Sequence, residues 1–342
     1  MKKVLSLFLV ALLAVTMLAG CGETTPPAAE NTPAASNPAV EVPPADNGND
    51  KLVVGFAQIG QESGWRDAET NDIMWYAAQN IDTIELHFAD AQQKQENQIN
   101  AIKAFIDMGV DVIGLPPVVS TGWDAIFAEA NEAGIPIILV DRNIEGWEDM
   151  EGVTFIGSDV ILEGQNAAEE IATLLGGSGN IVELQGTVGS SAANDRYKGF
   201  HDRIEEKYPD IKVLDSQSGD FTRAGGKQVM ESFLKTYPGQ IDAIYAHNDD
   251  MVLGAIEAIK EAGLRPGEDI KTVSCDGVRA IFEAMIAGEA NVTVECSPLL
   301  AAQFFQAAQD LKDGKSLPKF IQADEDVYRR ETAEADLPNR KY

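Results

Sequence analysis

From Lys51 onward, short β-branched runs alternate with amphipathic stretches of helical period, and this alternation limits the possible folds of the chain. It is typical of repeated strand and helix units that build parallel sheets. Roughly ten strands exceed what one open twisted sheet commonly holds, so we predict two α/β lobes in series with a break near Ser158. The expected strands are 52–58, 84–89, 111–115, 135–140 and 153–157, then 180–185, 211–216, 241–246, 270–275 and 291–295.

Helices are expected between these strands. The segment "QENQINAIKAFIDMG" ends at Gly109 and "GAIEAIKEAG" ends at Gly263, and glycine commonly follows the last turn of a helix. A further helix near 298–313 and a strand-like "VYRR" at 327–330 complete the expected elements.

The first 20 residues have the pattern of a bacterial lipoprotein signal peptide. A positive "MKK" precedes an apolar run, and small residues in "LAGC" precede Cys21. An uncleaved membrane anchor is the alternative, but the apolar run is shorter than the ~20 residues of a spanning helix. We therefore expect cleavage before Cys21, lipidation of that cysteine and tethering outside the cytoplasmic membrane. Residues 21–50, rich in Pro and Ala, are expected to be a flexible tether.

The formal net charge of the chain, −29, excludes one class of partner. A polyanion repels nucleic acid phosphates and anionic lipid headgroups, so we expect no nucleic acid partner and membrane contact only through the lipid. The folded part retains Cys275 and Cys296. They can pair in an oxidising compartment, but two buried free thiols are the preferred interpretation.

Charged and aromatic side chains gather directly after the expected strands. In open parallel sheets, ligands bind beyond the carboxyl ends of the strands. Ser, Asp and Asn at such places also serve as helix N-caps, but arginine and aromatic side chains do not, and a cation there opposes the helix dipole. The pattern therefore favours a shared binding cleft. The residues are Glu62, Trp65, Arg66, Asp141, Arg142, Asp195, Arg196, Phe221, His247, Asn248, Asp249, Asp250, Asp276 and Glu295.

The side chains of this cleft indicate the kind of ligand. Guanidinium and carboxylate groups form directional hydrogen bonds that match adjacent hydroxyls, and Trp65 and Phe221 offer flat faces for a sugar ring. Four carboxylates facing three arginines leave the cleft with a net formal charge near zero. Such a cleft suits a neutral polyol better than an anion. The charged residues are Glu62, Asp141, Asp276 and Glu295 against Arg66, Arg142 and Arg196.

Signals for catalysis, metals and cofactors are weak. His87, His201 and His247 lack metal-ligand spacing. The segment "GDFTRAGGK" lacks the first glycine of a phosphate-binding loop, and "GQESG" is not a nucleophile elbow. A carboxylate pair for glycoside hydrolysis depends on spatial separation and stays open, but carboxylates paired with arginines are poor general acids. We expect no catalytic residues, no metal site and no cofactor.

Several long runs of the sequence resemble the periplasmic sugar-binding proteins of ABC importers, in the group that binds ribose, galactose and related sugars. The resemblance extends from about Leu52 to the final "LPNRKY". It is most specific in "VGFAQIGQESGWRDAETN", "ADAQQKQENQI", "PPVVSTGW", "VELQGTVG", "SQSGDFTR", "YAHNDDMVLGAI" and "GEANVTVE".

The resemblance implies a type I periplasmic-binding-protein fold with two Rossmann-like lobes joined by three crossings. The implied lobes comprise 51–158 with 297–324 and 159–296 with 325–342. Implied ligand-binding residues are Glu62, Trp65, Arg66, Asp141, Arg142, Arg196, Phe221, Asn248, Asp276 and Glu295, and Asp90, Asp195 and Asp249 are second-tier candidates with capping or supporting roles as the alternative.

The resemblance also implies a function. We expect a monomeric, lipid-anchored protein that captures a monosaccharide, with a galactofuranose-like sugar as first choice, by hinge closure and delivers it to an ABC permease. Two alternatives remain open at this point: an extracellular carbohydrate-active enzyme, and a sugar-sensing receptor for a chemotaxis or kinase partner. Incubation with the sugar distinguishes the enzyme, because only an enzyme changes it.

Overall fold

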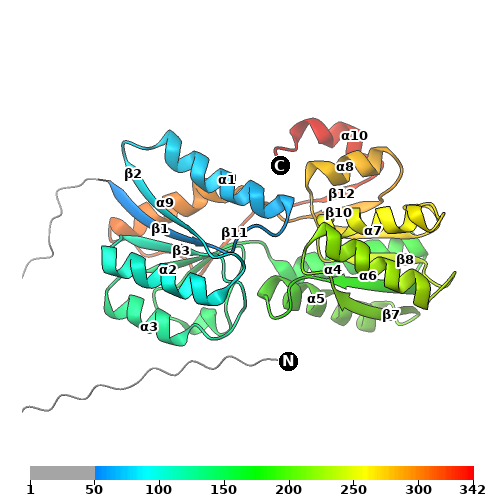
Figure 1. Cartoon of the computed structure of the whole chain (residues 1–342), viewed down its shortest axis with the longest axis horizontal. Coiled ribbons are helices and arrows are strands. Elements are labelled where there is room, and N and C mark those ends of the chain that lie inside the picture. The colour runs from blue at the N-terminus through cyan, green and yellow to red at the C-terminus, as the bar shows by residue number, and fades with distance from the viewer. Residues whose placement is uncertain (1–50) are drawn as a thin grey trace, which may run out of the picture. The chain divides into compact units, whose positions relative to one another are not determined.

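The computed structural model describes residues 51–342 as two α/β lobes of similar plan (Figure 1). The expected signal peptide, Cys21 and the tether lie outside the described residues. Residues 50–342 form one compact unit that contains both sheets and all four hydrophobic clusters described below. Residues 51–342 therefore contain a hydrophobic core for each lobe.

The first sheet has the order β11, β5, β4, β3, β1, β2, and all its strands are parallel. Its strands are β1 (Leu52–Gln58), β2 (Ile84–Asp90), β3 (Val112–Leu115), β4 (Ile137–Val140), β5 (Thr154–Gly157) and β11 (Phe320–Gln322). Strand β11 was not expected from the sequence, because its three residues carry no periodic signal. Its helices are α1 (Gly64–Gln79), α2 (Gln95–Met108), α3 (Asp124–Glu132) and α9 (Ala301–Lys312), with a 3-10 turn η1 (Trp147–Asp149).

The second sheet has the order β12, β10, β9, β8, β6, β7, and β12 runs antiparallel to β10. Its strands are β6 (Gly179–Gln185), β7 (Ile211–Ser218), β8 (Ala243–Ala246), β9 (Lys271–Asp276), β10 (Val292–Glu295) and β12 (Val327–Arg329). Its helices are α4 (Val160–Leu175), α5 (Ser191–Lys207), α6 (Arg223–Thr236), α7 (Asp249–Glu261), α8 (Arg279–Ile286) and α10 (Ala333–Asp336), with a 3-10 turn η2 (Leu337–Asn339). The expected two-lobed α/β class is confirmed.

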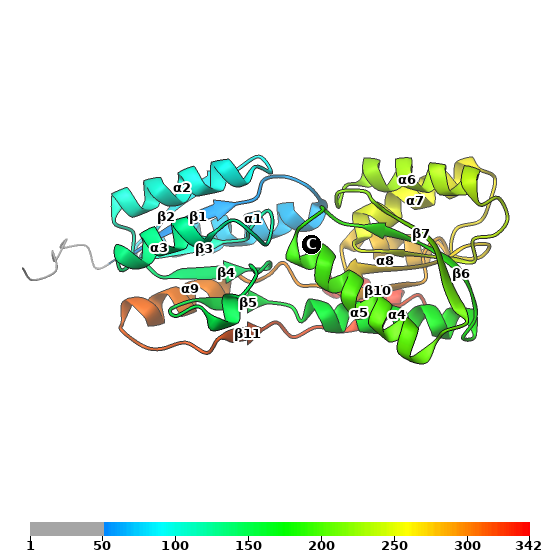
Figure 2. The ribbon, with the colours of Figure 1, turned by 90° about the horizontal axis from the view of Figure 1, so that it is seen from below.

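Both faces of each sheet are covered by helices, as the view from below shows (Figure 2). In β1, Val54 and Phe56 pack toward α1 and α9, whereas Ala57 belongs to the cluster of α2 and α3. In β6, Val182 packs with α6, α7 and α8, and Ile181 packs with α4 and α5. Consecutive strand residues point to opposite faces, so each buried strand needs apolar residues on both sides. This explains the continuous apolar runs in the sequence.

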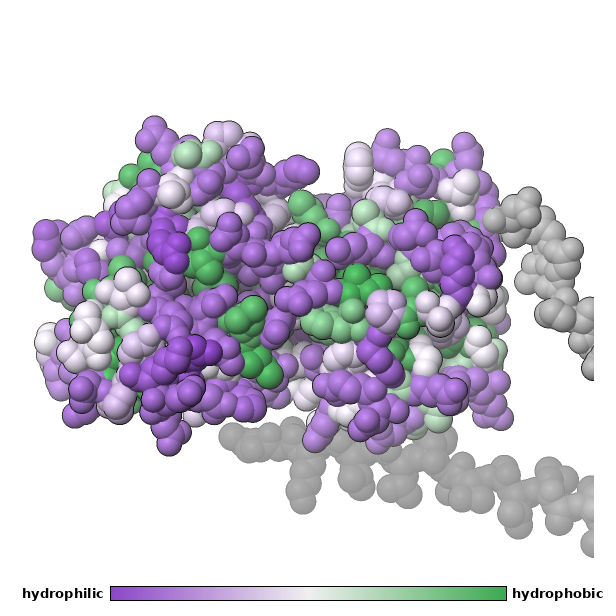
Figure 3. All heavy atoms as spheres, turned by 180° about the vertical axis from the view of Figure 1, so that it is seen from behind, coloured by the Kyte–Doolittle hydropathy of each residue, from purple (hydrophilic) through white to green (hydrophobic). Residues whose placement is uncertain are grey.

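The outer surface contrasts with this core. In Figure 3 most of the visible surface is hydrophilic, with separate small hydrophobic areas. Within residues 51–342, no helix is both long enough and apolar enough to cross a membrane.

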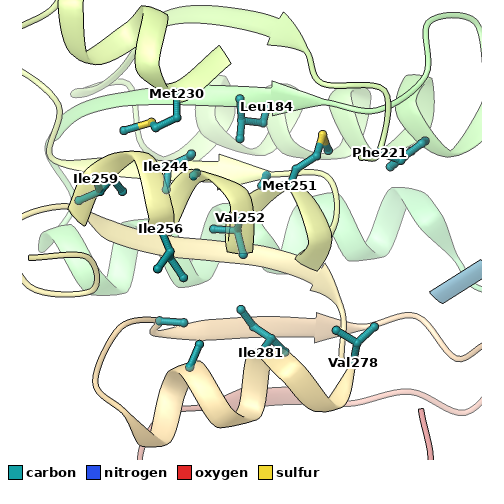
Figure 4. Packing of buried hydrophobic residues seen from close by; sticks show 14 of the residues in the cluster. Leu184, Phe221, Met230, Ile244, Met251, Val252, Ile256, Ile259, Val278 and Ile281 are labelled. Carbon is teal, nitrogen blue, oxygen red and sulfur yellow. The ribbon is translucent and has the colours of Figure 1, made fainter. Parts of the chain in front are cut away.

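Close packing in the core of the second lobe holds Phe221, which lies on the side of this lobe that faces the first lobe. Figure 4 shows Val252, Ile256 and Ile259 of α7 against the sheet, with Phe221 at the edge of the same cluster. Phe221 is 3% exposed, so its ring is held by the core.

Candidate functional site

A small cavity lies between the two lobes. The first lobe contributes its residues through the segment after β1, the start of α1 and the segment after β4. The second lobe contributes the start of α5, the last residue of β9 and the segments after β7, β8 and β10. Its lining residues are Glu62, Ser63, Trp65, Arg66, Asp141, Arg142, Ala192, Arg196, Phe221, Asn248, Asp276 and Cys296.

The carboxyl ends of the parallel strands bring these residues together, because all strand ends of one sheet lie at the same edge. Helix α1 begins at Gly64, and the Ser63 side chain caps it by accepting a hydrogen bond from the Arg66 amide at 3.2 Å. Trp65 and Arg66 therefore lie in the first turn of a helix that starts at the cavity. Asn248 caps α7 in the same way, and its Nδ2 donates to the Phe221 carbonyl at 3.0 Å.

Three lining residues have an unusual backbone. Asp141, Phe221 and Asp276 have positive φ angles of 63°, 59° and 125°. At Asp141 the Arg142 amide donates to the Val140 carbonyl at 2.6 Å, which closes a tight three-residue turn of a rare and strained kind. Backbone strain in non-glycine residues collects at functional sites, where the surrounding structure maintains it.

Arg66 organises the carboxylates of the first lobe. Its guanidinium bonds to Glu69 and Asp141, and its Nε lies 3.3 Å from Oε1 of Glu62. Burial by itself lowers the pKa of Arg66, but the charges of Glu69, Asp141 and Glu62 outweigh that effect and hold the pKa above its ordinary value. Arg66 thus binds three carboxylates at once and keeps this wall rigid.

Arg142 retains open hydrogen-bonding capacity. Its Nη2 donates to Oε1 of Glu62 at 2.5 Å, while its buried Nε and Nη1 have no hydrogen-bond partner within residues 51–342. Burial lowers the pKa of Arg142, and the charge of Glu62 opposes this effect. Buried donors are nearly always satisfied in folded proteins, so these two are available to a ligand.

Asp276 offers the matching open acceptor on the other lobe. Its Oδ1 lies 3.8 Å from Nη2 of Arg196, and its buried Oδ2 has no partner within residues 51–342. Burial raises the pKa of Asp276 well above the usual range, and Arg196 opposes the rise. A ligand hydroxyl that donates to Oδ2 would supply the missing hydrogen bond and reduce the free-energy cost of burying this carboxylate.

Two aromatic rings flank the charged groups. The Trp65 Nε1 donates to the Cys296 carbonyl at 2.6 Å, which joins the two lobes, and the Arg66 guanidinium lies 4.7 Å from the Trp65 ring. The Arg142 guanidinium lies 5.1 Å from the Phe221 ring. Both distances are those of cation–π contacts, which hold each guanidinium against a flat surface.

Gly186 leaves the space that the Phe221 ring occupies. A Cβ atom at Gly186 would lie 1.9 Å from Cζ of Phe221. We expect Gly186→Ala to lower the free energy of unfolding by about 1–3 kcal/mol, because an added methyl group overpacks the core. Chemical denaturation measures this loss. In the Phe221→Leu background, Gly186→Ala should lower the free energy of unfolding by less. An equal loss in both backgrounds would show that the Phe221 ring does not cause it.

The structure gathers nine of the ten expected binding residues around the cavity, and the exception is Glu295. Its Oε1 accepts from Arg340 at 2.5 Å and from the Tyr342 hydroxyl at 3.1 Å, and its Oε2 accepts from the Tyr328 hydroxyl. Glu295 thus binds the C-terminal segment instead of lining the cavity. The cavity lining then contains three carboxylates and three arginines, so its formal charges cancel, whereas the sequence indicated four carboxylates against three arginines.

The three second-tier residues also lie outside the cavity lining. Asp90 accepts the Gln92 amide in an exposed turn. Asp195 is half-buried and borders two other surface hollows. Asp249 is buried and accepts hydrogen bonds from Ser274, Thr293 and two backbone amides, so it fastens α7 to β9 and β10.

Ser63, Ala192 and Cys296 also line the cavity, although they were not expected there from the sequence. Cys296 directly follows β10 and therefore carried the same strand-end signal as Glu295. Ala192 has no polar group to reveal it. Glu69 and Glu163, the buried partners of Arg66 and Arg196, were also not expected from the sequence. Both lie within helices, where a single carboxylate normally indicates a residue that faces solvent. Cys275 and Cys296 carry free, buried thiols.

A match to a family model covers residues 54–316, and that family is described as the periplasmic binding protein domain. The galactofuranose-binding protein YtfQ of Escherichia coli K12 is 48% identical over 294 residues, which are 85% of this chain and 92% of that protein. The ribose import binding protein RbsB of Bacillus subtilis is 34% identical, with 68% of this chain and 73% of that protein covered.

Solved structures resemble the chain equally well. The periplasmic binding component of an arabinose ABC transporter from Shewanella sp. ANA-3, bound to α- and β-L-arabinofuranose, has a TM-score of 0.81 and 48% identity, with 84% of this chain and 95% of that chain covered. A Mycobacterium smegmatis structure in complex with β-D-fucofuranose has a TM-score of 0.81 and 47% identity, with 85% and 95% covered.

Proposed function

The chain belongs to the periplasmic binding protein domain family, and we propose that it captures a monosaccharide in the furanose form for an ABC importer. One observation carries this proposal: the interlobe cavity has three carboxylates, three arginines and two aromatic rings on its lining. Such a lining matches the paired hydroxyls and the flat apolar face of a neutral sugar. The furanose form is favoured because three relatives, each 47–48% identical, are described with galactofuranose, arabinofuranose or fucofuranose.

The proposed mechanism is closure of the two lobes around the sugar. Arg142 of the first lobe donates from Nε and Nη1, and Asp276 of the second lobe accepts at Oδ2. Each lobe holds only part of the sugar's hydrogen-bond set, so the ligand stabilises the closed arrangement more than the open one. The Trp65 contact with the Cys296 carbonyl joins the lobes beside the sugar.

We propose as sugar-binding residues those that line the cavity and were also expected from their position near the strand ends. Asp90, Asp249 and Glu295 are assigned supporting roles, in keeping with their contacts. Asp195 is assigned a supporting role because it lies outside the cavity lining. We place the lobes at 51–158 with 297–324 and at 159–296 with 325–342, because these limits separate the strands of the two sheets. The proposed sugar-binding residues are Glu62, Trp65, Arg66, Asp141, Arg142, Arg196, Phe221, Asn248 and Asp276.

Members of this family act outside the cytoplasm. We propose that the mature chain works there as a monomer, anchored by lipid at Cys21, with residues 22–50 as its tether. Delivery to permease subunits completes the proposed role. The tether would keep the captured sugar near the membrane that holds them.

Calorimetric titration of residues 51–342 tests the sugar assignment. We expect heat with D-galactose, D-fucose or L-arabinose, and a bound ring in the furanose form. The ring form is read from the anomeric carbon signal of ¹³C-labelled sugar in NMR spectra of the complex. No heat with any pentose or hexose would sink the proposal, and a bound pyranose would overturn the ring form. Sugar recovered unchanged after incubation separates binding from enzymatic conversion.

A further inference from the structure

Three chain segments connect the two sheets: the one between β5 and α4, the one between β10 and α9, and the one between β11 and β12. Ser158, Cys296 and Glu325 lie in these three segments, and Glu163 lies in the first turn of α4. We propose that Glu163, Cys296 and Glu325 form a binding site for a divalent cation of the zinc class, in which Cys296 also borders the sugar cavity.

The geometry brings three potential ligand atoms together. One atom each of Glu163, Cys296 and Glu325 lie within 4.8 Å of one another. Zinc bonds of ~2.0–2.3 Å to oxygen and sulfur place tetrahedral ligands roughly 3.3–3.8 Å apart, so side-chain shifts of about 1 Å suffice. The Ser158 hydroxyl lies 3.3 Å from the Cys296 sulfur and donates to Glu325, which supports the carboxylate from behind.

An independent observation indicates that one carboxylate oxygen of the cluster lacks a hydrogen-bond donor. Oε2 of Glu163 accepts from Nε of Arg196 at 2.6 Å, but its buried Oε1 has no hydrogen-bond partner within residues 51–342. The Glu163 side chain is only 3% exposed. A buried carboxylate oxygen without a donor is costly, and a cation at the centre of the cluster would satisfy it.

The local charges fit a divalent ion. With a metal bound and the three ligands deprotonated, two carboxylates and one thiolate would contribute three negative charges, and Arg196 contributes one positive charge. A divalent cation therefore neutralises the cluster. Because the thiolate is a soft ligand and the carboxylates are hard ones, this donor set suits zinc better than calcium or magnesium.

A surface hollow of about 560 Å³ gives the ion a route to the cluster. It is lined by Glu163 and Glu325 themselves, and by Asp159, Glu295 and Asp326. These carboxylates create a negative potential that concentrates cations at the entrance. The sequence predicted no metal site, because residues 163, 296 and 325 are far apart along the chain.

Zinc titration of residues 51–342 tests the proposal. We expect one equivalent of Zn²⁺ to bind, and Glu325→Gln to weaken its affinity at least tenfold. Glutamine keeps an oxygen for Ser158 and for the Ser297 amide, which donates to Glu325 at 2.9 Å, so the variant should fold and still bind sugar. Asp326→Asn is the matched control. It removes a carboxylate from the same hollow but not from the ligand set, and should change the zinc affinity less than twofold.

Cobalt substitution tests the sulfur ligand directly. We expect Co²⁺ to produce a thiolate charge-transfer absorption band that disappears in Cys296→Ser and persists in Cys275→Ser. The proposal is overturned if Glu325→Gln and Asp326→Asn bind zinc alike, if the band persists without Cys296, or if Ca²⁺ competes equally with Zn²⁺. Sugar titration of the same variants shows separately whether the sugar site is intact.

Discussion

Arg142→Ala is expected to weaken sugar binding about 100-fold. The substitution removes the two buried donors, Nε and Nη1, that have no partner within residues 51–342. Hydrogen bonds of charged groups contribute about 1.5–3 kcal/mol each, so two of them contribute at least about 3 kcal/mol, and a loss near that lower limit corresponds to about two decades of affinity. It also removes the cation that lies against Phe221. Calorimetric titration of wild type and variant with the same sugar measures the difference.

Arg142→Lys is the matched control for charge. Lysine retains a positive charge beside Glu62 but lacks the planar set of donors that can reach two hydroxyls at once. We therefore expect an affinity between those of the wild type and Arg142→Ala. Equal binding by all three proteins would remove Arg142 from the sugar site, even if the rest of the proposed function stands.

Arg196→Met is expected to destabilise the fold by about 3–5 kcal/mol. Arg196 is 3% exposed, and it donates to Glu163 and to the His247 carbonyl, each at 2.6 Å. Removing one member of a buried ion pair leaves the other as an uncompensated charge. The carboxylate of Glu163 would then be buried without any donor. Denaturant unfolding of residues 51–342 measures the loss.

A double substitution identifies the source of that loss. Glu163→Gln replaces the stranded carboxylate by a neutral amide of the same shape. We expect the variant with both Arg196→Met and Glu163→Gln to be more stable than Arg196→Met alone, because neighbouring substitutions of one ion pair are not additive. If the double variant is less stable than Arg196→Met, the loss does not arise from the buried charge.

The strand-end rule identified most of the cavity but failed to place Glu295. The rule predicts at which edge of the sheet a residue lies. It does not predict which residues form hydrogen bonds or ion pairs with its side chain. Glu295 is the last residue of β10, yet Arg340 and Tyr342 bind its carboxylate from the C-terminal segment. No local pattern in the sequence reveals a partner 45 residues away.

The cluster at the lobe crossings illustrates the same limit more strongly. Glu163, Cys296 and Glu325 belong to three separate segments, and each has an ordinary sequence context. Glu163 reads as a first-turn helix carboxylate, which the helix dipole favours. Only the return of the chain between the sheets brings the three side chains within 4.8 Å.

The sequence by itself determined the two-lobed α/β class, because buried parallel strands require apolar runs and the helices between them require amphipathic ones. It also determined which strand ends carry arginine, carboxylate and aromatic groups. The tertiary structure alone decided that Glu295 leaves the cavity, that three positive φ angles shape its walls, and that Arg142 and Asp276 keep open hydrogen-bonding atoms. The reason is physical: composition and periodicity report local burial, whereas the partner of a buried charge is set by long-range packing.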